Sequence, residues 1–290
     1  MFTINDVKAL RDKTGAGVLD CKKALEACNG DMSAAVDFLR EKGIAKAEKK
    51  QSRIAAEGLT AIYSNKDKAV ILEVNCETDF VAKNSEFKDF VDTLGNALLK
   101  AGVTTMEEAL EVKVKSETIN TLLVNLTAKL GEKLSFRRFE FVKKSSKEVF
   151  GIYSHMGGRI STLTILEGGN EEVAKDISMH VTAQHPLYMT REEVPADVLE
   201  HEKEVIKEQA INEGKDAKIA EKMVNGRINK YYGEVCAVEQ EYVKNPDQKV
   251  SDYLKETNAE LKKMIRYEVG EGIEKKQEDF ANEVMNQIKK

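Results

Sequence analysis

The sequence contains a repeat, since Ala61-Ile62-Tyr63-Ser64 resembles Gly151-Ile152-Tyr153-Ser154, which lies ninety residues later. Each copy is followed by a short turn and then by an apolar stretch, which is Val70-Ile71-Leu72-Glu73-Val74 in the first copy and Leu163-Thr164-Ile165-Leu166 in the second. Short apolar runs bounded by turns are typical of buried strands. Each copy therefore predicts a pair of strands.

An amphipathic helix is expected after each strand pair. Apolar residues recur at helical spacing there, namely Phe87, Phe90, Val91, Leu94 and Leu98 in the first copy and Val173, Ile177 and Val181 in the second. Two β-β-α units in one chain indicate a duplicated sequence. The predicted fold class is α+β, with a core of two similar subdomains.

The N-terminal part predicts a compact unit of three helices. Apolar residues at helical spacing begin at Ile4, and they begin again at Val18 after a glycine-rich break. Asp31 follows an Asn-Gly turn and is placed to cap the third helix. We expect Gly43 to end that helix and a linker rich in Lys and Ala to cover residues 45–53.

A helical hairpin is expected between residues 185 and 231. Pro195 can open its first helix. The apolar positions of the two helices are Val198, Leu199, Val205 and Ile206, and then Ile219, Ala220, Met223, Val224 and Ile228. Seams of this kind form a coiled-coil arm. The arm is either an extra packing element or a contact arm that binds a partner or a second copy of the chain, and the pattern favours neither.

The tail combines a strand, a turn and a helix. Residues 264–269 are strand-like, Gly270-Glu271-Gly272 predicts a turn, and a last helix is expected to carry Phe280, Val284 and Ile288.

Composition limits the class of protein. The 290 residues are 41% apolar, 33% charged and 6% aromatic, with a net charge of −5. That apolar content excludes bulk disorder, and an acidic chain argues against nucleic acid as its main partner. The first 53 residues carry 11 basic and 8 acidic side chains, an excess more typical of a solvated face than of an RNA site. With no apolar run near ~20 residues and no signal peptide at the start, we expect no membrane contact and a cytoplasmic location.

The motifs of catalysis are missing. The sequence has no phosphate-binding Gly-x-x-x-x-Gly-Lys loop and no complete Gly-x-Gly-x-x-Gly motif. Its histidines and cysteines lack the spacing of metal ligands, and His180 and His185 fall on different helix faces. We therefore expect no enzyme activity, no catalytic residue, no metal site and no cofactor.

One connection is unusual, the stretch from Glu77 to Asn84 between the second strand and the Phe-rich helix. Phe80 either packs back into the core or projects outward beside Asp79. The residues alone favour a cap at Thr78 or Asp79 with Phe80 inside.

Three stretches of the chain follow the pattern of one known family. They are Leu10-Arg11-Asp12-Lys13-Thr14-Gly15-Ala16-Gly17-Val18-Leu19-Asp20-Cys21-Lys22-Lys23-Ala24-Leu25, Glu73-Val74-Asn75-Cys76-Glu77-Thr78-Asp79-Phe80-Val81-Ala82 and Val269-Gly270-Glu271-Gly272-Ile273-Glu274-Lys275. The chain thus resembles the bacterial translation elongation factor Ts family, the guanine-nucleotide exchange factors of elongation factor Tu. Some members carry methionines where this chain has Val18 and Leu19, and both choices are apolar.

The resemblance implies a division of the chain into five parts. These are a ubiquitin-associated-like (UBA-like) helical domain with its linker (residues 1–53), an N-terminal core subdomain (54–140), a C-terminal core subdomain (141–184 and 232–262), the coiled-coil arm (185–231) and a C-terminal helical module (263–290).

The resemblance also implies functional residues. The segment Thr78, Asp79, Phe80 and Val81 is expected to intrude near the magnesium site of the partner's GTPase domain, with Phe80 as a wedge between helices. Val18 and Leu19 are expected to touch a helix of the same domain, as is the C-terminal module. His155 matches a histidine that contacts the partner near the core. The expected partner is elongation factor Tu, bound through its GTPase domain and a further domain.

Two other functions compete with nucleotide exchange. A scaffold or ubiquitin-like binding module would use the N-terminal helices, with the core as a spacer. A small-molecule enzyme would need a convergent polar pocket, and the sequence indicates none.

Overall fold

The computed structural model describes residues 2–14, 16–214 and 216–274, and it mixes helices with small sheets, which confirms the α+β class. The chain folds into two compact units. Of the described residues, the first unit comprises 2–14, 16–63, 72–141 and 268–274, and the second comprises 64–71, 142–214 and 216–267. The finer division into five parts and the UBA-like character of the N-terminal helices stay predictions.

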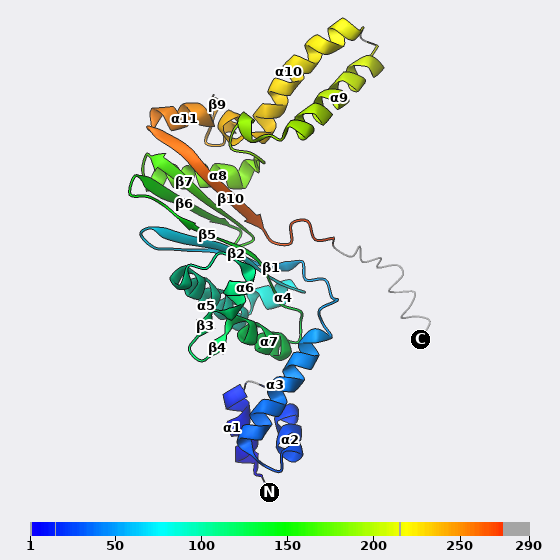
Figure 1. Ribbon diagram of the computed structural model, residues 1–290, viewed down its shortest axis with the longest axis vertical. Helices are drawn as coiled ribbons and strands as arrows, with labels where there is room; N and C mark the ends of the chain where they lie inside the picture. The colour runs from blue at the N-terminus through cyan, green and yellow to red at the C-terminus, as the bar shows by residue number, and fades with distance from the viewer. Residues whose placement is uncertain (1, 15, 215, 275–290) are drawn as a thin grey trace. The chain divides into compact units, whose positions relative to one another are not determined.

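Three helices form the N-terminal part, as the sequence predicts: α1 (Ile4–Thr14), α2 (Val18–Ala27) and α3 (Met32–Glu48) (Figure 1). The Asp31 carboxylate accepts hydrogen bonds from the backbone N–H groups of Ser33 and Ala34, at 2.8 and 2.9 Å, and thus caps α3. The helices share a small apolar core of Val7, Leu10, Cys21, Ala24, Leu25 and Ala35.

The prediction that Gly43 ends the third helix is wrong, because α3 continues to Glu48. Glycine costs about 1 kcal/mol relative to alanine inside a helix, which good helix formers on both sides offset. Gly43 lies against α7 (Ile119–Leu130), where an added Cβ would make an ordinary contact of 3.5 Å with the Cβ of Ala128.

The first repeat forms the predicted strand pair and helix, here β1 (Glu57–Ser64), β2 (Lys68–Cys76) and α5 (Ser85–Ala101). All five apolar residues expected on α5 are buried, from Phe87 to Leu98. A third strand, β5 (Ser135–Lys143), completes the sheet in the order β1-β2-β5. The sequence pattern did not indicate β5, because Arg137, Arg138 and Glu140 interrupt its apolar residues.

Short elements connect α5 to β5. They are α6 (Met106–Glu111), β3 (Lys113–Val114), β4 (Glu117–Thr118) and α7. β3 and β4 pair antiparallel, and Thr118 caps α7 by accepting the Thr121 N–H at 3.1 Å.

The second repeat forms β6 (Glu148–His155), β7 (Ile160–Gly168) and α8 (Glu171–Gln184), again as predicted. β6 and β7 pair antiparallel, with Gly151 opposite Thr164. α8 lies very close to β6, since a Cβ at Gly151 would lie 2.0 Å from the carbonyl oxygen of Ala174. β10 (Ala259–Glu268) completes this sheet in the order β10-β7-β6.

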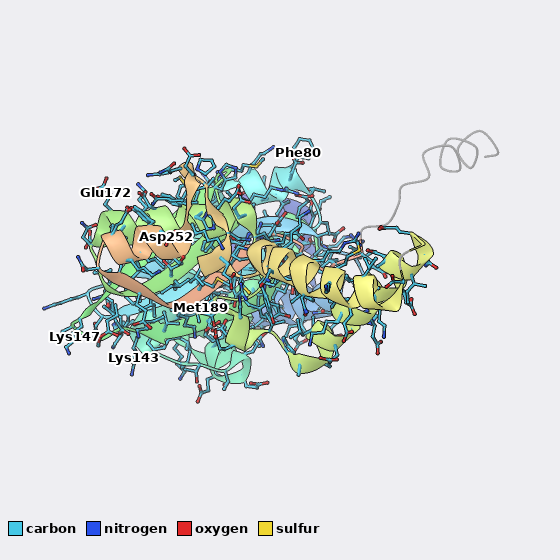
Figure 2. The ribbon with its side chains drawn as sticks, turned by 90° about the horizontal axis from the view of Figure 1, so that it is seen from above. Phe80, Lys143, Lys147, Glu172, Met189 and Asp252 are labelled. Atoms are coloured by element: carbon cyan, nitrogen blue, oxygen red, sulfur yellow. The ribbon has the colours of Figure 1, made fainter. Side chains whose placement is uncertain are left out.

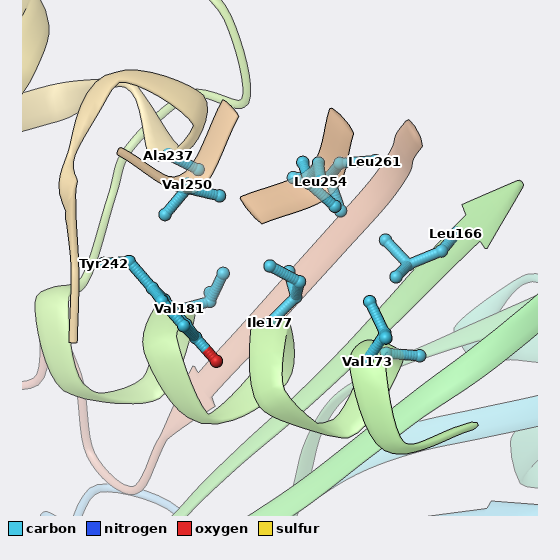
Figure 3. Close-up of a cluster of buried hydrophobic side chains, with 10 residues drawn as sticks. Leu166, Val173, Ile177, Val181, Ala237, Tyr242, Val250, Leu254 and Leu261 are labelled. Atoms are coloured by element: carbon cyan, nitrogen blue, oxygen red, sulfur yellow. The ribbon is translucent and has the colours of Figure 1, made fainter. Parts of the chain in front are cut away.

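The outer face of α8 buries the apolar residues expected on it, Val173, Ile177 and Val181 (Figure 3). They pack against residues that come from the short elements η2 (Ala237–Glu239), β8 (Glu241–Tyr242) and α11 (Val250–Glu256) and from β7 and β10. The short strand β9 (Asn245–Lys249) pairs antiparallel with β8. The other members of the cluster are Leu166, Ala174, Ala237, Tyr242, Val250, Leu254 and Leu261. Residues 237–256 thus complete, together with β7 and β10, the apolar core around α8.

The predicted hairpin is present as α9 (Ala196–Asn212) and α10 (Ala217–Val235), and Pro195 occupies the N-cap of α9. The two helices run side by side in Figure 1. Ile206, Ala210, Ala220 and Ile228 are buried, while Ile211 and Ile219 remain 48% and 46% exposed. A single turn of 3-10 helix, η1 (Arg191–Glu193), precedes the hairpin.

The strand predicted at residues 264–269 is confirmed as part of β10, which begins earlier, at Ala259. The turn at Gly270-Glu271-Gly272 is also confirmed. The helix expected to carry Phe280, Val284 and Ile288 lies outside the described residues.

Candidate functional site

The candidate site is the corner between β2 and α5, which contains the short helix α4 (Asp79–Lys83). Thr78 caps this helix, since its Oγ1 accepts the Val81 N–H at 3.3 Å. The buried Cys76 thiol donates to the Thr78 carbonyl oxygen at 3.1 Å. Burial raises the pKa of Cys76 to about 12, so this cysteine is an inert packing group rather than a nucleophile.

Phe80 is 80% exposed, and it projects outward in Figure 2. The expectation from the residues alone is therefore half right, because Thr78 caps the helix but Phe80 does not pack inside. The reason lies in the helical period, which places residues two apart roughly 200° apart around the axis. Ala82 is buried, so Phe80 faces solvent.

Asp79 lies beside Phe80 at the start of α4. The Lys83 ammonium donates to its carboxylate at 2.6 Å, one helical turn away. This hydrogen bond holds the pKa of Asp79 below its ordinary value. The corner thus presents an ionised carboxylate next to an exposed aromatic ring.

Residues far away in the sequence anchor this corner. The Glu132 carboxylate accepts hydrogen bonds from the backbone N–H groups of Glu77 and Thr78, and from the Thr78 hydroxyl. Glu132 stands in the loop between α7 and β5. Its role was not predicted, because no local sequence pattern reports a hydrogen bond between residues more than fifty positions apart.

A buried carboxylate on β2 joins two of the stretches that carry the family resemblance. The Glu73 side chain is fully buried and accepts hydrogen bonds from Arg137, Arg138 and Asn75, and from the Gly270 N–H at 2.8 Å. Burial by itself raises the pKa of Glu73, but these hydrogen bonds outweigh it and keep the pKa below the ordinary value. An ionised Glu73 therefore fastens the turn after β10 to β2.

Two other predicted contact residues, Val18 and Leu19, open α2. Their side chains are 54% and 72% exposed, and Ile4 on α1 is 88% exposed. The N-terminal helices thus leave apolar side chains in water while burying the opposite faces.

The last predicted contact residue, His155, ends β6 and is exposed. Its ring stacks on Tyr153, with the ring centroids 6.3 Å apart. The next residue, Met156, is 70% exposed. His155 belongs to the second unit, whereas the β2–α5 corner and the N-terminal helices belong to the first.

Comparison with protein families identifies the chain. A family model described as "Elongation factor TS" matches residues 77–271, which is more than half of the sequence. The chain belongs to the elongation factor Ts family. Members of this family are translation elongation factors that promote nucleotide exchange on elongation factor Tu.

The matched range of this elongation factor Ts family member begins at Glu77, so it includes the whole β2–α5 corner. It also includes Glu132, His155 and the turn at Gly270. The family resemblance stated from the sequence is therefore confirmed.

The remaining polar residues fit packing rather than chemistry. His180 is buried, with Nε2 3.0 Å from Gln240 Oε1, and its Nδ1 accepts the Val243 N–H at 3.2 Å. Burial lowers the pKa of His180, which keeps the ring neutral. Among residues 2–14, 16–214 and 216–274, no group of three or more His, Cys, Asp or Glu side chains is arranged to hold a metal ion. No helix within those ranges is long and apolar enough to cross a bilayer.

Proposed function

We propose that this chain is the guanine-nucleotide exchange factor of elongation factor Tu. In this proposal it binds the GDP form of the GTPase, displaces Mg²⁺ and promotes release of GDP so that GTP can load. The supporting observation is Phe80, an aromatic side chain that is 80% exposed on an anchored corner inside the family match. A large apolar side chain held in water at a fixed point is typical of a group that is buried in a partner.

The chemistry of the partner's magnesium site explains how a wedge can act. Mg²⁺ requires near-ideal octahedral geometry and bridges the phosphate oxygens of the nucleotide. A small displacement of the ion's protein ligands therefore weakens nucleotide binding strongly. Phe80 gains about 1.5–3 kcal/mol when it is buried, which helps to hold a displaced helix in its new position.

Thermodynamic linkage sets the limits of this mechanism. If the factor weakens the binding of GDP, then GDP weakens the binding of the factor by the same ratio. The factor speeds exchange in both directions, so the supply of GTP determines the direction. No step requires a general base, a metal ion or a cofactor on this chain.

The other predicted contact residues would raise the affinity for elongation factor Tu rather than the maximal rate of GDP release. Val18 and Leu19 are exposed apolar side chains that fit a docking site on the GTPase domain, together with the C-terminal module. His155, beside the exposed Met156, would contact a further domain. In this proposal the protein acts in the cytoplasm, where translation takes place, without binding nucleic acid or membrane directly.

The arm of α9 and α10 keeps two interpretations, a packing element or a contact arm. Ile211 and Ile219 are half-exposed near the turn of the hairpin, which supports a contact with elongation factor Tu or with a second copy of this chain. Sedimentation in the absence of elongation factor Tu distinguishes these two partners. If the arm forms a homodimer, the wild-type chain sediments as a dimer and the Ile211→Asp, Ile219→Asp variant as a monomer. If the arm contacts elongation factor Tu, both sediment as monomers.

The release of fluorescent GDP from elongation factor Tu tests the function. The wild-type chain is expected to speed release by orders of magnitude, and the variant with Asp79→Ala and Phe80→Ala to lose most of that gain. A variant with Val18→Asp and Leu19→Asp is the matched comparison, since it should need a higher concentration to reach a similar maximal rate. Release that is unchanged by the wild-type chain would overturn the proposal. It would leave the scaffold function of the N-terminal helices as the alternative.

A further inference from the structure

We propose that Glu132 is a positioning residue for Asp79 and Phe80. It acts through a reciprocal set of hydrogen bonds between residues 77–78 and residues 132–133, which we call the clasp. The inference rests on the proposed exchange function and adds to it the residues that hold the wedge in place before the partner arrives.

The first half of the clasp is the Glu132 carboxylate. Its Oε2 accepts the N–H groups of Glu77 at 3.1 Å and Thr78 at 3.0 Å, and its Oε1 accepts the Thr78 hydroxyl at 2.6 Å. A carboxylate offers about four acceptor sites and forms stronger hydrogen bonds than a neutral acceptor. One side chain thus fixes the backbone directly before α4.

The Thr78 hydroxyl passes this constraint into α4. While its hydrogen is donated to Glu132, its oxygen accepts the Val81 N–H at 3.3 Å. The three groups therefore form a short chain from Glu132 to the first turn of the helix. Asp79 and Phe80 are the two residues enclosed by that turn.

The second half of the clasp runs in the opposite direction. The Glu77 carboxylate accepts the Lys133 N–H, at 2.5 Å, and pairs with Arg53 at 3.3 Å. The Lys133 ammonium donates to the carbonyl oxygens of Gln51 and Arg53, at 2.7 and 2.9 Å. The clasp therefore also holds the segment that leads from the N-terminal helices into β1.

Packing alone fixes this corner poorly. Ala82 is buried and Val81 is half-buried, so two small apolar side chains supply the packing of α4. A helix of five residues is unstable in isolation. The hydrogen bonds of the clasp add the constraint that limits Phe80 to one orientation, and a wedge that is already oriented loses less entropy when it enters the partner.

The experiment separates the rate of exchange from affinity. The maximal rate of GDP release at saturating factor, and the factor concentration that gives half of it, are measured for the wild-type chain and for Glu132→Ala, Glu132→Gln, Thr78→Val and Thr78→Ser. Glu86→Ala is the matched control, because Glu86 pairs with Lys129 on the surface of the same unit, 2.6 Å away, and takes no part in the clasp.

Glu132→Ala is expected to lower the maximal rate about tenfold or more, because small misplacements of a positioned group cost one to two orders of magnitude. Its half-saturating concentration should change far less, since Val18, Leu19 and the other contacts are intact. Thr78→Val should behave like Glu132→Ala, Glu132→Gln should lie between it and the wild type, and Thr78→Ser should restore the wild-type rate. Glu86→Ala should match the wild type.

A second readout reports position directly. Amide hydrogen exchange in the peptide that covers residues 77–84 should become faster in Glu132→Ala, while the helices α1 to α3 keep their protection. The melting temperature of every variant is measured to detect general destabilisation. If Glu132→Ala is destabilised, the test rests on Thr78→Val and Glu132→Gln, which keep the size of the side chain.

Three results would overturn the proposal. The first is a maximal rate in both Glu132→Ala and Thr78→Val that stays within about twofold of the wild type, well below the cost of misplacement. The second is a loss confined to affinity, and the third is unchanged amide exchange at residues 77–84. If the wild-type chain itself failed to speed GDP release while the amide exchange still responded to Glu132→Ala, the exchange function would be wrong and the clasp would survive as a structural device alone.

Discussion

The two sheets have the same strand order, yet they differ in the connection after the second strand of the repeat. In both sheets that second strand lies in the middle, as β2 and as β7. In both, the next long helix begins with an asparagine cap, Asn84 for α5 and Asn170 for α8. In the second copy Gly169 alone separates β7 from its cap, whereas residues 77–83 separate β2 from Asn84.

The two copies therefore differ in one connection while they share their strands and their long helix. The additional residues after β2 form α4, which presents Asp79 and Phe80 to solvent and is held by a side chain from a distant loop. Binding residues on a connection, supported by a rigid scaffold, are a common arrangement in proteins.

The largest expected effect tests how closely each helix approaches its sheet. A Cβ at Gly151 would lie 2.0 Å from the Ala174 carbonyl oxygen, and backbone cannot move aside cheaply. In the first copy the glycine is on the helix, where a Cβ at Gly95 would meet the ring of Tyr63, also at 2.0 Å. We expect Gly151→Ala to lower the free energy of unfolding by about 3–4 kcal/mol.

For the matched variant Gly95→Ala we expect a loss of about 1–2 kcal/mol, because the Tyr63 ring can turn away and alanine favours the helix. Urea unfolding measures both values. A larger loss for Gly95→Ala than for Gly151→Ala would contradict the distinction between a side-chain and a backbone neighbour.

The next effect compares two glutamates that come after the same Ile-Leu pair, Glu73 on β2 and Glu167 on β7. Glu73 is fully buried against two arginines, while Glu167 pairs with Lys262 at the surface, 3.1 Å away. Removing one partner of a buried ion pair is costly, so Glu73→Gln should lower the free energy of unfolding by about 2–3 kcal/mol.

Glu167→Gln is the control for this pair, and its effect should be much smaller because exposed ion pairs contribute little. Urea unfolding of both variants at pH 7 decides the comparison. Equal losses of unfolding free energy would show that the buried ion pairs of Glu73 stabilise the fold no more than the exposed pair of Glu167.

A smaller expected effect is a difference in the pH at which the two copies lose stability. Burial lowers the pKa of His180, so as the pH falls below about 6.5 the unfolded state takes up a proton more readily and the second copy loses stability. The contribution of Glu73 to stability is lost at a lower pH than that of His180. Its contribution is complete above about pH 4.3, the ordinary value, and is lost as the pH falls through the folded pKa.

Amide hydrogen exchange of α8 and of β2 across pH 7 to 4 measures this difference. α8 should lose protection first, and His180→Gln should remove the part of that loss that begins below about pH 6.5. If β2 weakened before α8, the assignment of the two groups to separate pH ranges would be wrong.

The smallest effect concerns Phe80 itself. Because this ring is 80% exposed, Phe80→Ala should change the free energy of unfolding by less than about 0.5 kcal/mol, even though the proposed function requires the ring. Phe87→Leu, on the buried face of α5, should cost about 1–2 kcal/mol and leave nucleotide release intact. A marked loss of stability in Phe80→Ala would mean that the ring packs against the chain in solution.

The local elements of the fold could be predicted from local patterns. The repeat, the apolar spacing of α5 and α8, the Asp31 cap and the helical hairpin are properties of neighbouring residues, so the sequence alone predicted them. β5 was missed because the adjacent pair Arg137-Arg138 breaks the alternation of its apolar residues, and both arginines find their partner, Glu73, only in the folded sheet. The prediction at Gly43 was wrong because a single glycine costs only about 1 kcal/mol inside a helix, and α3 continues to Glu48.

The candidate site divides in the same way. The family and a helix cap at Thr78 or Asp79 could be predicted from the sequence, because they depend on residue identity and on spacing within one turn, and the structure assigns the cap to Thr78. Three facts required the folded structure, namely that Phe80 faces water, that Glu73 fastens Gly270 and that Glu132 holds the corner. Those facts depend on which distant segments the fold brings within hydrogen-bonding distance, and hydrogen bonds act over a few ångströms whatever the separation along the chain.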